Sequence, residues 1–127
     1  MKKLDLLREE LLEPEFLGAQ TCDTLFVGWG STYGPLAEAV KTLNEIEPGK
    51  YGALSFGDVY PLPAKTLTDM AKRVTRIINV EQNATGQLKD LIREQTGIEC
   101  TSSILKYDGR QISGEEIVER IQKGGRM

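Results

Sequence analysis

The stretch Asn79-Val80-Glu81-Gln82-Asn83-Ala84-Thr85-Gly86-Gln87-Leu88 decides the fold of this chain. The β-branched pair Ile77-Ile78 directly before it predicts a buried strand. Leu88, Leu91 and Ile92 recur at helical spacing behind it and predict a helix. Polar residues therefore crowd where a strand passes into a helix. In open α/β sheets this passage lies at the carboxyl ends of the strands, where such folds place their binding surfaces.

The same strand-to-helix pattern recurs along the chain. We expect strands at 24–27, 51–56, 76–80 and 103–107, and helices at 35–46, 67–74, 85–96 and from 113 onward. The last helix has the clearest start, because Ser113 and Glu116 form a capping box and Ile112 and Ile117 occupy the hydrophobic-staple positions. Alternating strands and helices predict an α/β fold with right-handed crossovers, a largely parallel sheet and helices on both faces.

Residues 4–12 carry leucines at helical spacing, and Pro14 ends the predicted helix. A helix this short is marginal by itself and must pack against something. Two alternatives stay open. The helix covers a flank of its own domain, or it is a connector from an upstream domain.

Composition excludes several classes of function. The 127 residues suffice for one domain with a core, and the net charge of −3 gives no basic footprint for nucleic acid or an anionic membrane. The apolar runs are too short to span a bilayer. The basic start Met1-Lys2-Lys3 is not followed by an apolar signal core. We therefore expect a cytoplasmic protein.

The chain has two cysteines, Cys22 and Cys100, and no histidine. Neither cysteine has a second ligand at metal-site spacing, which argues against a zinc site or an iron–sulfur cluster within this chain. The absence of histidine excludes a histidine-dependent triad. We expect both cysteines to act as small hydrophobic residues at the boundaries of elements.

The loop Gly28-Trp29-Gly30-Ser31-Thr32-Tyr33-Gly34 has the same strand-to-helix setting. Its glycines resemble a dinucleotide fingerprint with one residue too many, which would place an anion at the helix start. The alternative is a tight turn that lets another backbone approach closely. Trp29 favours an interface, because an indole between two glycines cannot easily reach its own core.

The second loop offers Glu81, Gln82, Asn83 and Gln87 for catalysis or ligand binding. No second carboxylate, histidine or lysine stands at a fixed spacing to share proton transfer. The alternative is a polar network that caps the following helix through Asn83 or Thr85 and meets a partner surface. We expect assembly rather than chemistry at this edge, through an interface of Gly28, Trp29, Gly30, Ser31, Thr32, Glu81, Asn83 and Gln87.

Four motifs carry a resemblance to a known family. They are Asp23-Thr24-Leu25-Phe26-Val27-Gly28-Trp29-Gly30-Ser31-Thr32, Val59-Tyr60-Pro61-Leu62-Pro63, Asn79-Val80-Glu81-Gln82-Asn83 with Gly86-Gln87-Leu88, and Leu105-Lys106-Tyr107-Asp108-Gly109-Arg110. Together they resemble the C-terminal domain of the alpha subunit of 2-oxoacid:ferredoxin oxidoreductases, especially the 2-oxoglutarate type. The resemblance implies a three-layer α/β/α fold like the transketolase C-terminal domain, with a mixed sheet of about five strands. The fifth strand, at an antiparallel edge, is not located by the sequence.

The family is thiamine-diphosphate dependent, converts a 2-oxoacid and coenzyme A to acyl-CoA and carbon dioxide, and reduces ferredoxin. The resemblance implies partners for this chain: an upstream pyrimidine-binding domain, a beta subunit and in some complexes gamma and delta subunits. Thiamine diphosphate, magnesium, iron–sulfur clusters, coenzyme A and ferredoxin are implied for the whole complex only.

This chain departs from the family in what it lacks. The diphosphate and magnesium motif is absent, because Gly57-Asp58-Val59 begins like it and then departs at Val59. No catalytic, cofactor-binding or metal-binding residue of the family therefore transfers to it. We expect residues 1–22 to be a helix and linker from a missing upstream domain, and residues 23–127 to form the α/β domain. Two alternatives remain: a freestanding module that binds coenzyme A or a nucleotide at the Gly28–Gly34 loop, and an enzyme with an unrecognised site.

Overall fold

The computed structural model describes residues 15–29, 32–56, 65–81, 87–106 and 111–124, which form a five-stranded sheet. The strands are β1 (Glu15–Gly18), β2 (Thr24–Trp29), β3 (Tyr51–Phe56), β4 (Arg76–Glu81) and β5 (Ser102–Leu105). Their spatial order is β1-β3-β2-β4-β5. Strand β1 runs antiparallel to β3, and the other neighbours are parallel, so the sheet is mixed and mostly parallel as expected.

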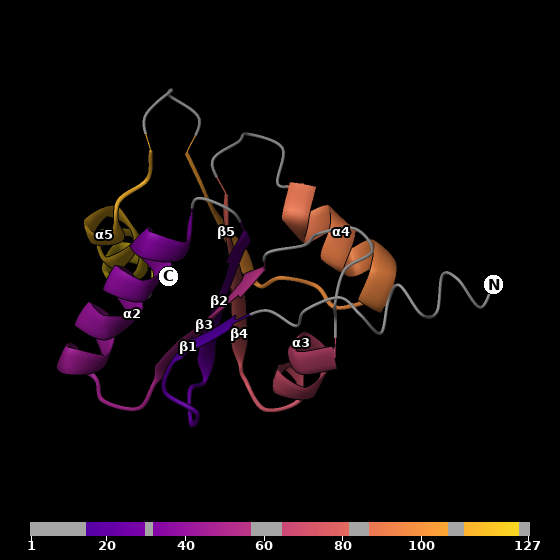
Figure 1. Cartoon of the computed structure of the whole chain (residues 1–127), viewed down its shortest axis with the longest axis horizontal. Coiled ribbons are helices and arrows are strands. Elements are labelled where there is room, and N and C mark those ends of the chain that lie inside the picture. Colours follow the sequence, from indigo (N-terminus) through magenta and orange to yellow (C-terminus); the bar gives the residue numbers. More distant parts are fainter. Residues whose placement is uncertain (1–14, 30–31, 57–64, 82–86, 107–110, 125–127) are drawn as a thin grey trace.

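Helices cover both faces of this sheet (Figure 1). They are α2 (Tyr33–Ile46), α3 (Lys65–Ala71), α4 (Gln87–Thr96) and α5 (Gly114–Gly124). Helices α2 and α5 pack on one face and α3 and α4 on the other, which confirms the three-layer architecture (Figure 1). Successive side chains of a strand point to opposite faces, so Phe26 belongs to the core under α2 and α5, whereas Leu25 and Val27 belong to the core under α3 and α4.

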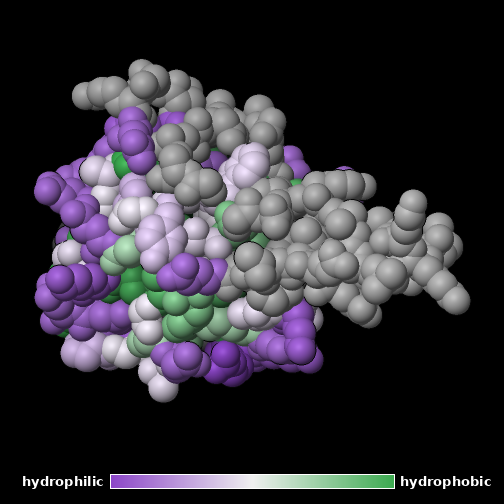
Figure 2. Space-filling view, in the orientation of Figure 1, coloured by the Kyte–Doolittle hydropathy of each residue, from purple (hydrophilic) through white to green (hydrophobic). Residues whose placement is uncertain are grey.

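Strand β1 is the antiparallel edge strand that the sequence did not locate. It lies within the segment 1–22, and Glu15 pairs with Ser55 and Gly18 with Gly52. The strand ends at Gly18, whose φ of 97° suits glycine, and a Cβ atom there would lie 2.3 Å from Cγ1 of Val40. Apolar side chains remain visible on the surface over β1 and the adjoining part of α2 (Figure 2).

The ends of several elements differ from the sequence prediction. Helix α2 begins at Tyr33, so Pro35 is its third residue, where an N–H is still not needed for the helical ladder. Helix α3 ends at Ala71. Val74 lies beyond the helix and is half-buried against the core under α3 and α4. Strand β5 ends at Leu105. The predicted helix at 4–12 lies outside the described residues, and so do residues 58–63 and 108–109 of two of the motifs.

The start of α5 confirms the sequence prediction. The backbone N–H of Glu116 donates to Oγ of Ser113 at 3.1 Å, and the N–H of Ser113 donates to Oε1 of Glu116 at 3.1 Å. Ile112 and Ile117 are both buried in the core beneath the helix. Within the part of the chain that the structure describes, no helix has the length and apolar character needed to cross a membrane.

Candidate functional site at the carboxyl edge of the sheet

The four parallel strands end level with one another at the upper edge of the sheet in Figure 1. Trp29 at the end of β2 pairs with Phe56 at the end of β3, and Glu81 at the end of β4 pairs with Leu105 at the end of β5. Strands β2 and β4 are also in register, since Val27 pairs with Asn79. Each of the four motif segments in the sequence therefore continues from a strand end at this one edge.

The first of these segments is packed tightly against its own helix. Thr32 is 2% exposed, and its hydroxyl donates to the carbonyl of Trp29 at 2.9 Å. A Cβ atom on Gly28 would lie 2.5 Å from Oγ1 of Thr32 and 2.8 Å from Cδ1 of Leu36. Gly28 is therefore needed for close packing within the chain. Trp29 is half-buried against the core under α3 and α4.

The second segment is anchored by a buried polar network. Asn79 and Glu81 are both 0% exposed. The Glu81 carboxylate accepts hydrogen bonds from Nδ2 of Asn79 at 2.6 Å and from the backbone N–H groups of Leu88 at 2.8 Å and Lys89 at 3.2 Å. Oδ1 of Asn79 in turn accepts from the hydroxyl of Ser103 at 2.6 Å. Glu81 thus caps α4 and ties the ends of β4 and β5 to it.

Sequence reasoning missed Glu81 as the cap of α4. Capping rules point to a residue directly before the helix, and Asn83 and Thr85 lie outside the described residues, as do Gly30 and Ser31. Gln87 is the first residue of α4. One available signal was a glutamate at the end of a buried strand, because a carboxylate buried there requires donors, and a helix N-terminus supplies them.

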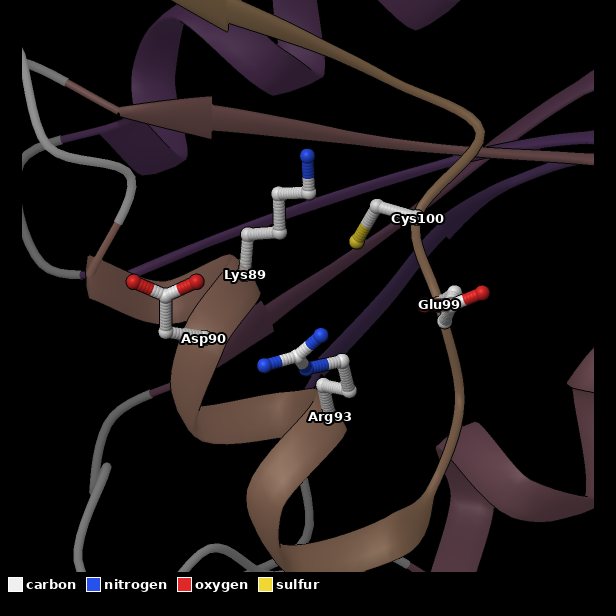
Figure 3. Close-up of a pocket in the computed structure, with 5 residues that line it drawn as sticks. All are labelled: Lys89, Asp90, Arg93, Glu99 and Cys100. Carbon is white, nitrogen blue, oxygen red and sulfur yellow. The ribbon is translucent and has the colours of Figure 1, made fainter.

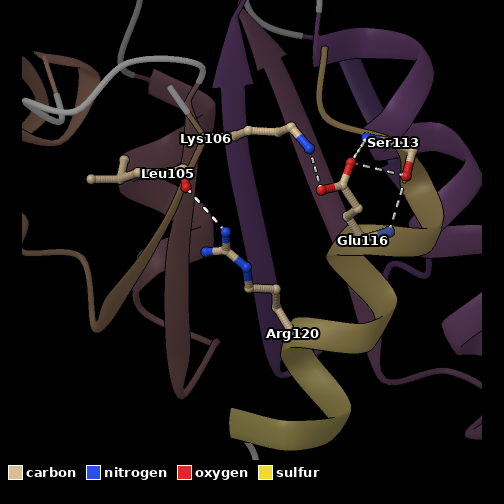
Figure 4. A network of polar contacts seen from close by, with 5 residues as sticks. All are labelled: Leu105, Lys106, Ser113, Glu116 and Arg120. Carbon is tan, nitrogen blue, oxygen red and sulfur yellow. Dashed lines mark hydrogen bonds and ion pairs between the residues drawn. The ribbon is translucent and has the colours of Figure 1, made fainter. Parts of the chain in front are cut away.

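A second charged contact, also missed, holds the end of β5 against α5 (Figure 4). Nζ of Lys106, whose side chain is 9% exposed, forms an ion pair with Oε2 of Glu116. Nη2 of Arg120 donates to the carbonyl of Leu105 at 3.2 Å. The hydrogen bond from Lys106, followed by that from the Ser113 backbone, lowers the pKa of Glu116. The residues before and after segment 82–86 are therefore joined by the hydrogen bonds of the Glu81 carboxylate. The residues before and after segment 107–110 are joined by the ion pair between Lys106 and Glu116.

This edge shows no catalytic set among the described residues. Its buried carboxylate, Glu81, is occupied by the helix cap. No three acidic or cysteine side chains of the described ranges gather where they could hold a metal ion. Cys22 and Cys100 are free and buried, and burial raises the pKa of both thiols, that of Cys100 to about 11. The described residues therefore do not fit a magnesium–diphosphate site or an iron–sulfur cluster.

The architecture first shows the type of fold. The described fold matches the solved structure of a split-gene transketolase, an inactive beta4 tetramer, with a TM-score of 0.62 over 88% of this chain and 42% of that chain. At 16% identity this likeness concerns the fold alone. The expected similarity to the transketolase C-terminal domain is thereby confirmed.

Sequence similarity then gives the family. Residues 22–117 match the pyruvate:ferredoxin oxidoreductase core domain II, and the chain belongs to this family. It is 32% identical to 2-oxoacid:ferredoxin oxidoreductase 1, subunit alpha, of Aeropyrum pernix, over 94% of this chain and 19% of that protein. The expected relationship to the alpha subunit of these oxidoreductases is confirmed.

Two solved structures agree with this assignment. The 2-oxoglutarate:ferredoxin oxidoreductase of Magnetococcus marinus, solved with 2-oxoglutarate, coenzyme A and succinyl-CoA bound, is 25% identical with a TM-score of 0.85, over 95% of this chain and 21% of that chain. The alpha chain of a probable 2-oxoacid ferredoxin oxidoreductase from Thermoplasma acidophilum is 29% identical with a TM-score of 0.60, over 91% of this chain and 98% of that chain. The chain spans about a fifth of the length of the curated relatives it matches.

Proposed function

We propose that this chain is a non-catalytic assembly domain of the alpha subunit of a 2-oxoacid:ferredoxin oxidoreductase, and that the enzyme acts on 2-oxoglutarate. The observation that carries the proposal is the state of Glu81. The edge where such folds place their binding surfaces has a carboxylate that is fully buried and committed to a helix cap. An edge built in this way holds its loops in place for a partner, and its buried carboxylate among the described residues is not available for proton transfer.

The rest of the enzyme supplies the chemistry in this proposal. Thiamine diphosphate, magnesium and the iron–sulfur clusters reside in an upstream pyrimidine-binding domain and in the beta, gamma or delta subunits. Ferredoxin and coenzyme A bind at the level of the complex. The 2-oxoglutarate bound in the Magnetococcus marinus enzyme supports the choice of substrate. The cytoplasmic location stays a prediction.

The proposed interface divides into inner and outer residues. Gly28, Thr32 and Glu81 shape the edge from within. The Thr32 hydroxyl and the Glu81 carboxylate both form hydrogen bonds with other residues of this chain. Trp29 is a half-buried aromatic side chain at this edge, and an anchor of this kind commonly contributes roughly 2 kcal/mol or more to an interface. Contacts of Gly30, Ser31, Asn83 and Gln87 with a partner stay predictions.

Trp29 fluorescence tests the proposal, because this is the only tryptophan of the chain. We expect red-shifted emission and ready acrylamide quenching for the chain alone, and a blue shift when the remaining subunits are added. Trp29→Ala should weaken association while the fold stays intact. Ile46→Ala is the matched control, since Ile46 is 55% exposed at the far end of α2 and should leave association unchanged.

Two outcomes would contradict the assembly role. One is blue, unquenchable emission from the isolated chain, which would place the indole in the chain's own core. The other is unchanged association of Trp29→Ala with the remaining subunits. A thermal shift with coenzyme A that Gly34→Val abolishes would instead support a freestanding ligand-binding module.

A further inference from the structure

The sheet has two edge strands, and their surroundings differ in chemistry. Strands β1 and β5 are equally short, and in the described ranges each pairs on one side only. The surface beside β5 is charged. The hollow between α4 and the segment that leads into β5 is lined by residues that include Lys89, Asp90, Arg93 and Glu99 (Figure 3). Charged side chains beside an edge strand discourage pairing with another chain, so the surroundings of β5 protect it.

Strand β1 has apolar side chains on both faces of the sheet. Phe16 packs against the core under α3 and α4, Leu17 packs against the core under α2 and α5, and both remain half-buried. The ring of Phe16 lies over β3, where a Cβ atom on Gly52 would be 3.0 Å from its Cζ atom. Apolar surface is visible over β1 and the adjoining part of α2 (Figure 2). A further strand beside β1 would remove more of this surface from water.

The backbone of β1 has groups that face away from the sheet. Ala19, directly after the strand, donates its N–H to the carbonyl of Tyr51 at 3.0 Å. In an antiparallel ladder such bonds recur at every second residue, so the odd-numbered residues of β1 face β3. The N–H and C=O groups of Phe16 and Gly18 point the other way, where the described part of the chain places no strand. A row of such groups is a template for pairing with another strand.

We propose that β1 of one copy of this chain pairs antiparallel with β1 of a second copy, about a two-fold axis at Leu17. A two-fold contact uses the same patch on both copies, so the patch must be complementary to itself. Strand β1 meets this condition in its register, its side chains and its charge. The inference does not rest on the assembly role proposed above, because it concerns a contact between two copies of this chain.

The backbone restricts the register of the pair. The outward groups of Phe16 and Gly18 must meet outward groups of the second copy. With the axis at Leu17, Phe16 lies opposite Gly18 of the second copy, so an aromatic side chain covers an edge glycine. Leu17 then lies opposite Leu17, and Glu15 lies opposite Ala19. With the axis at Phe16 instead, the Glu15 carboxylate would lie opposite Leu17, so the first register is favoured.

The charge of β1 does not oppose this pairing. Glu15 is the one charged residue of the strand, and its carboxylate accepts a hydrogen bond from the Tyr33 hydroxyl of its own copy at 2.9 Å. In the proposed register the two Glu15 positions are separated along the strands by roughly 13 Å. Exposed charges at this separation are largely screened at physiological ionic strength, where the Debye length is about 8 Å.

Disulfide trapping in the full 127-residue chain tests the pairing. At the axis the two Leu17 positions form a non-hydrogen-bonded pair, with Cα atoms about 4.5 Å apart, which a disulfide can span. We therefore expect Leu17→Cys to give a covalent dimer when oxidised glutathione is added. The native thiols of Cys22 and Cys100 are buried, so the unmodified chain should not crosslink. Ser102→Cys is the matched control, because Ser102 is exposed on the opposite edge strand and should give little dimer.

Two further cysteine variants test the register. Glu15→Cys and Ala19→Cys should crosslink to each other when they are mixed, because these positions lie opposite each other. Each alone should crosslink poorly, since it lies roughly 13 Å from its own copy. Sedimentation of the unmodified chain should show a reversible dimer. Leu17→Lys should raise the dissociation constant of this dimer by roughly tenfold or more, because it places two ammonium groups opposite each other.

The proposal is overturned if the unmodified chain sediments as a monomer up to millimolar concentration, or if Leu17→Lys leaves the dimer unchanged. It is also overturned if Leu17→Cys gives no more covalent dimer than Ser102→Cys, or if Glu15→Cys alone crosslinks as readily as the mixed variants. NMR spectra check that each variant is folded, and sedimentation of the unmodified chain decides the question where one is not. None of these outcomes bears on association with other subunits, which Trp29 reports separately.

Discussion

At Gly28 the chain leaves no room for one more carbon atom, because a Cβ atom there would meet the hydroxyl of Thr32, directly before helix α2, and the side chain of Leu36 within that helix. Gly28→Ala should therefore lower the free energy of unfolding by roughly 1–3 kcal/mol, the usual cost of overpacking. Urea denaturation of the isolated chain measures this change. The loss arises inside the domain, whatever the partner surface of the loop does.

Gly34→Ala is the matched control, because a Cβ atom there meets nothing within 4 Å and the residue is already helical. Alanine in a helix stabilises by roughly 0.5–1 kcal/mol relative to glycine, so this variant should be neutral or slightly more stable. If Gly28→Ala and Gly34→Ala destabilise the chain equally, close packing around Gly28 is not the cause of its loss of stability.

At the scale of elements, Glu81 joins three of them. Glu81→Gln removes the charge and one of the two acceptor oxygens, so the buried donors of Asn79, Leu88 and Lys89 compete for what remains. We expect a loss of roughly 1–3 kcal/mol in unfolding free energy. Hydrogen exchange should also accelerate at the Leu88 and Lys89 amides. Glu94→Gln on the exposed side of α4 is the control, and equal exchange rates in the two variants would contradict the capping role.

The contact between β5 and α5 should give a stability that depends on pH. The pKa of Glu116 is lowered from its ordinary value of 4.5, chiefly by the hydrogen bond from Lys106. A carboxyl group with a lowered folded-state pKa stabilises fully above its unfolded pKa, and this stabilisation is lost as the pH falls through the folded value. Chemical denaturation between neutral pH and pH values below 4.5 should therefore show a decline in stability. Glu116→Gln should reduce that decline, and Glu115→Gln, in the same helical turn, should retain it.

The elements that the sequence predicted well depend on neighbours in the sequence. The start of α5 was predictable because Ser113 and Glu116 contact each other across a single turn. Strand β1 was not, because its four residues are set by pairing with β3, where Glu15 meets Ser55. The ion pair between Lys106 and Glu116 depends on two elements meeting in space. The Glu81 cap depends on where the end of β4 lies relative to the start of α4, and a local sequence pattern does not predict that position.

For the whole molecule, the sequence predicted the shared edge because alternation of strands and helices forces parallel strands to end together. Register then places Trp29 beside Phe56 and Glu81 beside Leu105. The roles of single side chains were harder to predict. Thr32 and Glu81 are polar residues of the sequence motifs at this edge. Both are nevertheless buried, and both form hydrogen bonds within the chain. Burial of a polar side chain depends on tertiary packing, so a polar residue in a loop pattern does not reveal whether it faces inward.

A prediction for the whole molecule concerns thiamine diphosphate. We expect calorimetric titration of the isolated chain with thiamine diphosphate and magnesium to give no binding heat, because Gly57-Asp58-Val59 departs from the diphosphate motif and the described donors do not gather for a metal. A complete oxidoreductase stripped of its cofactor is the positive control. Micromolar binding by the isolated chain would contradict the non-catalytic role.

The strand order also determines when this sheet can form during synthesis. Strands β1 and β2 come first along the chain but do not pair with each other, because β3 lies between them and pairs with both. A ribosome releases the chain from its N-terminus, so neither early strand has a neighbour until residues 51–56 have emerged. Until then the apolar stretch of β2 is exposed without a ladder partner. A nascent chain stalled before Tyr51 would therefore present two unpaired strands to chaperones and proteases.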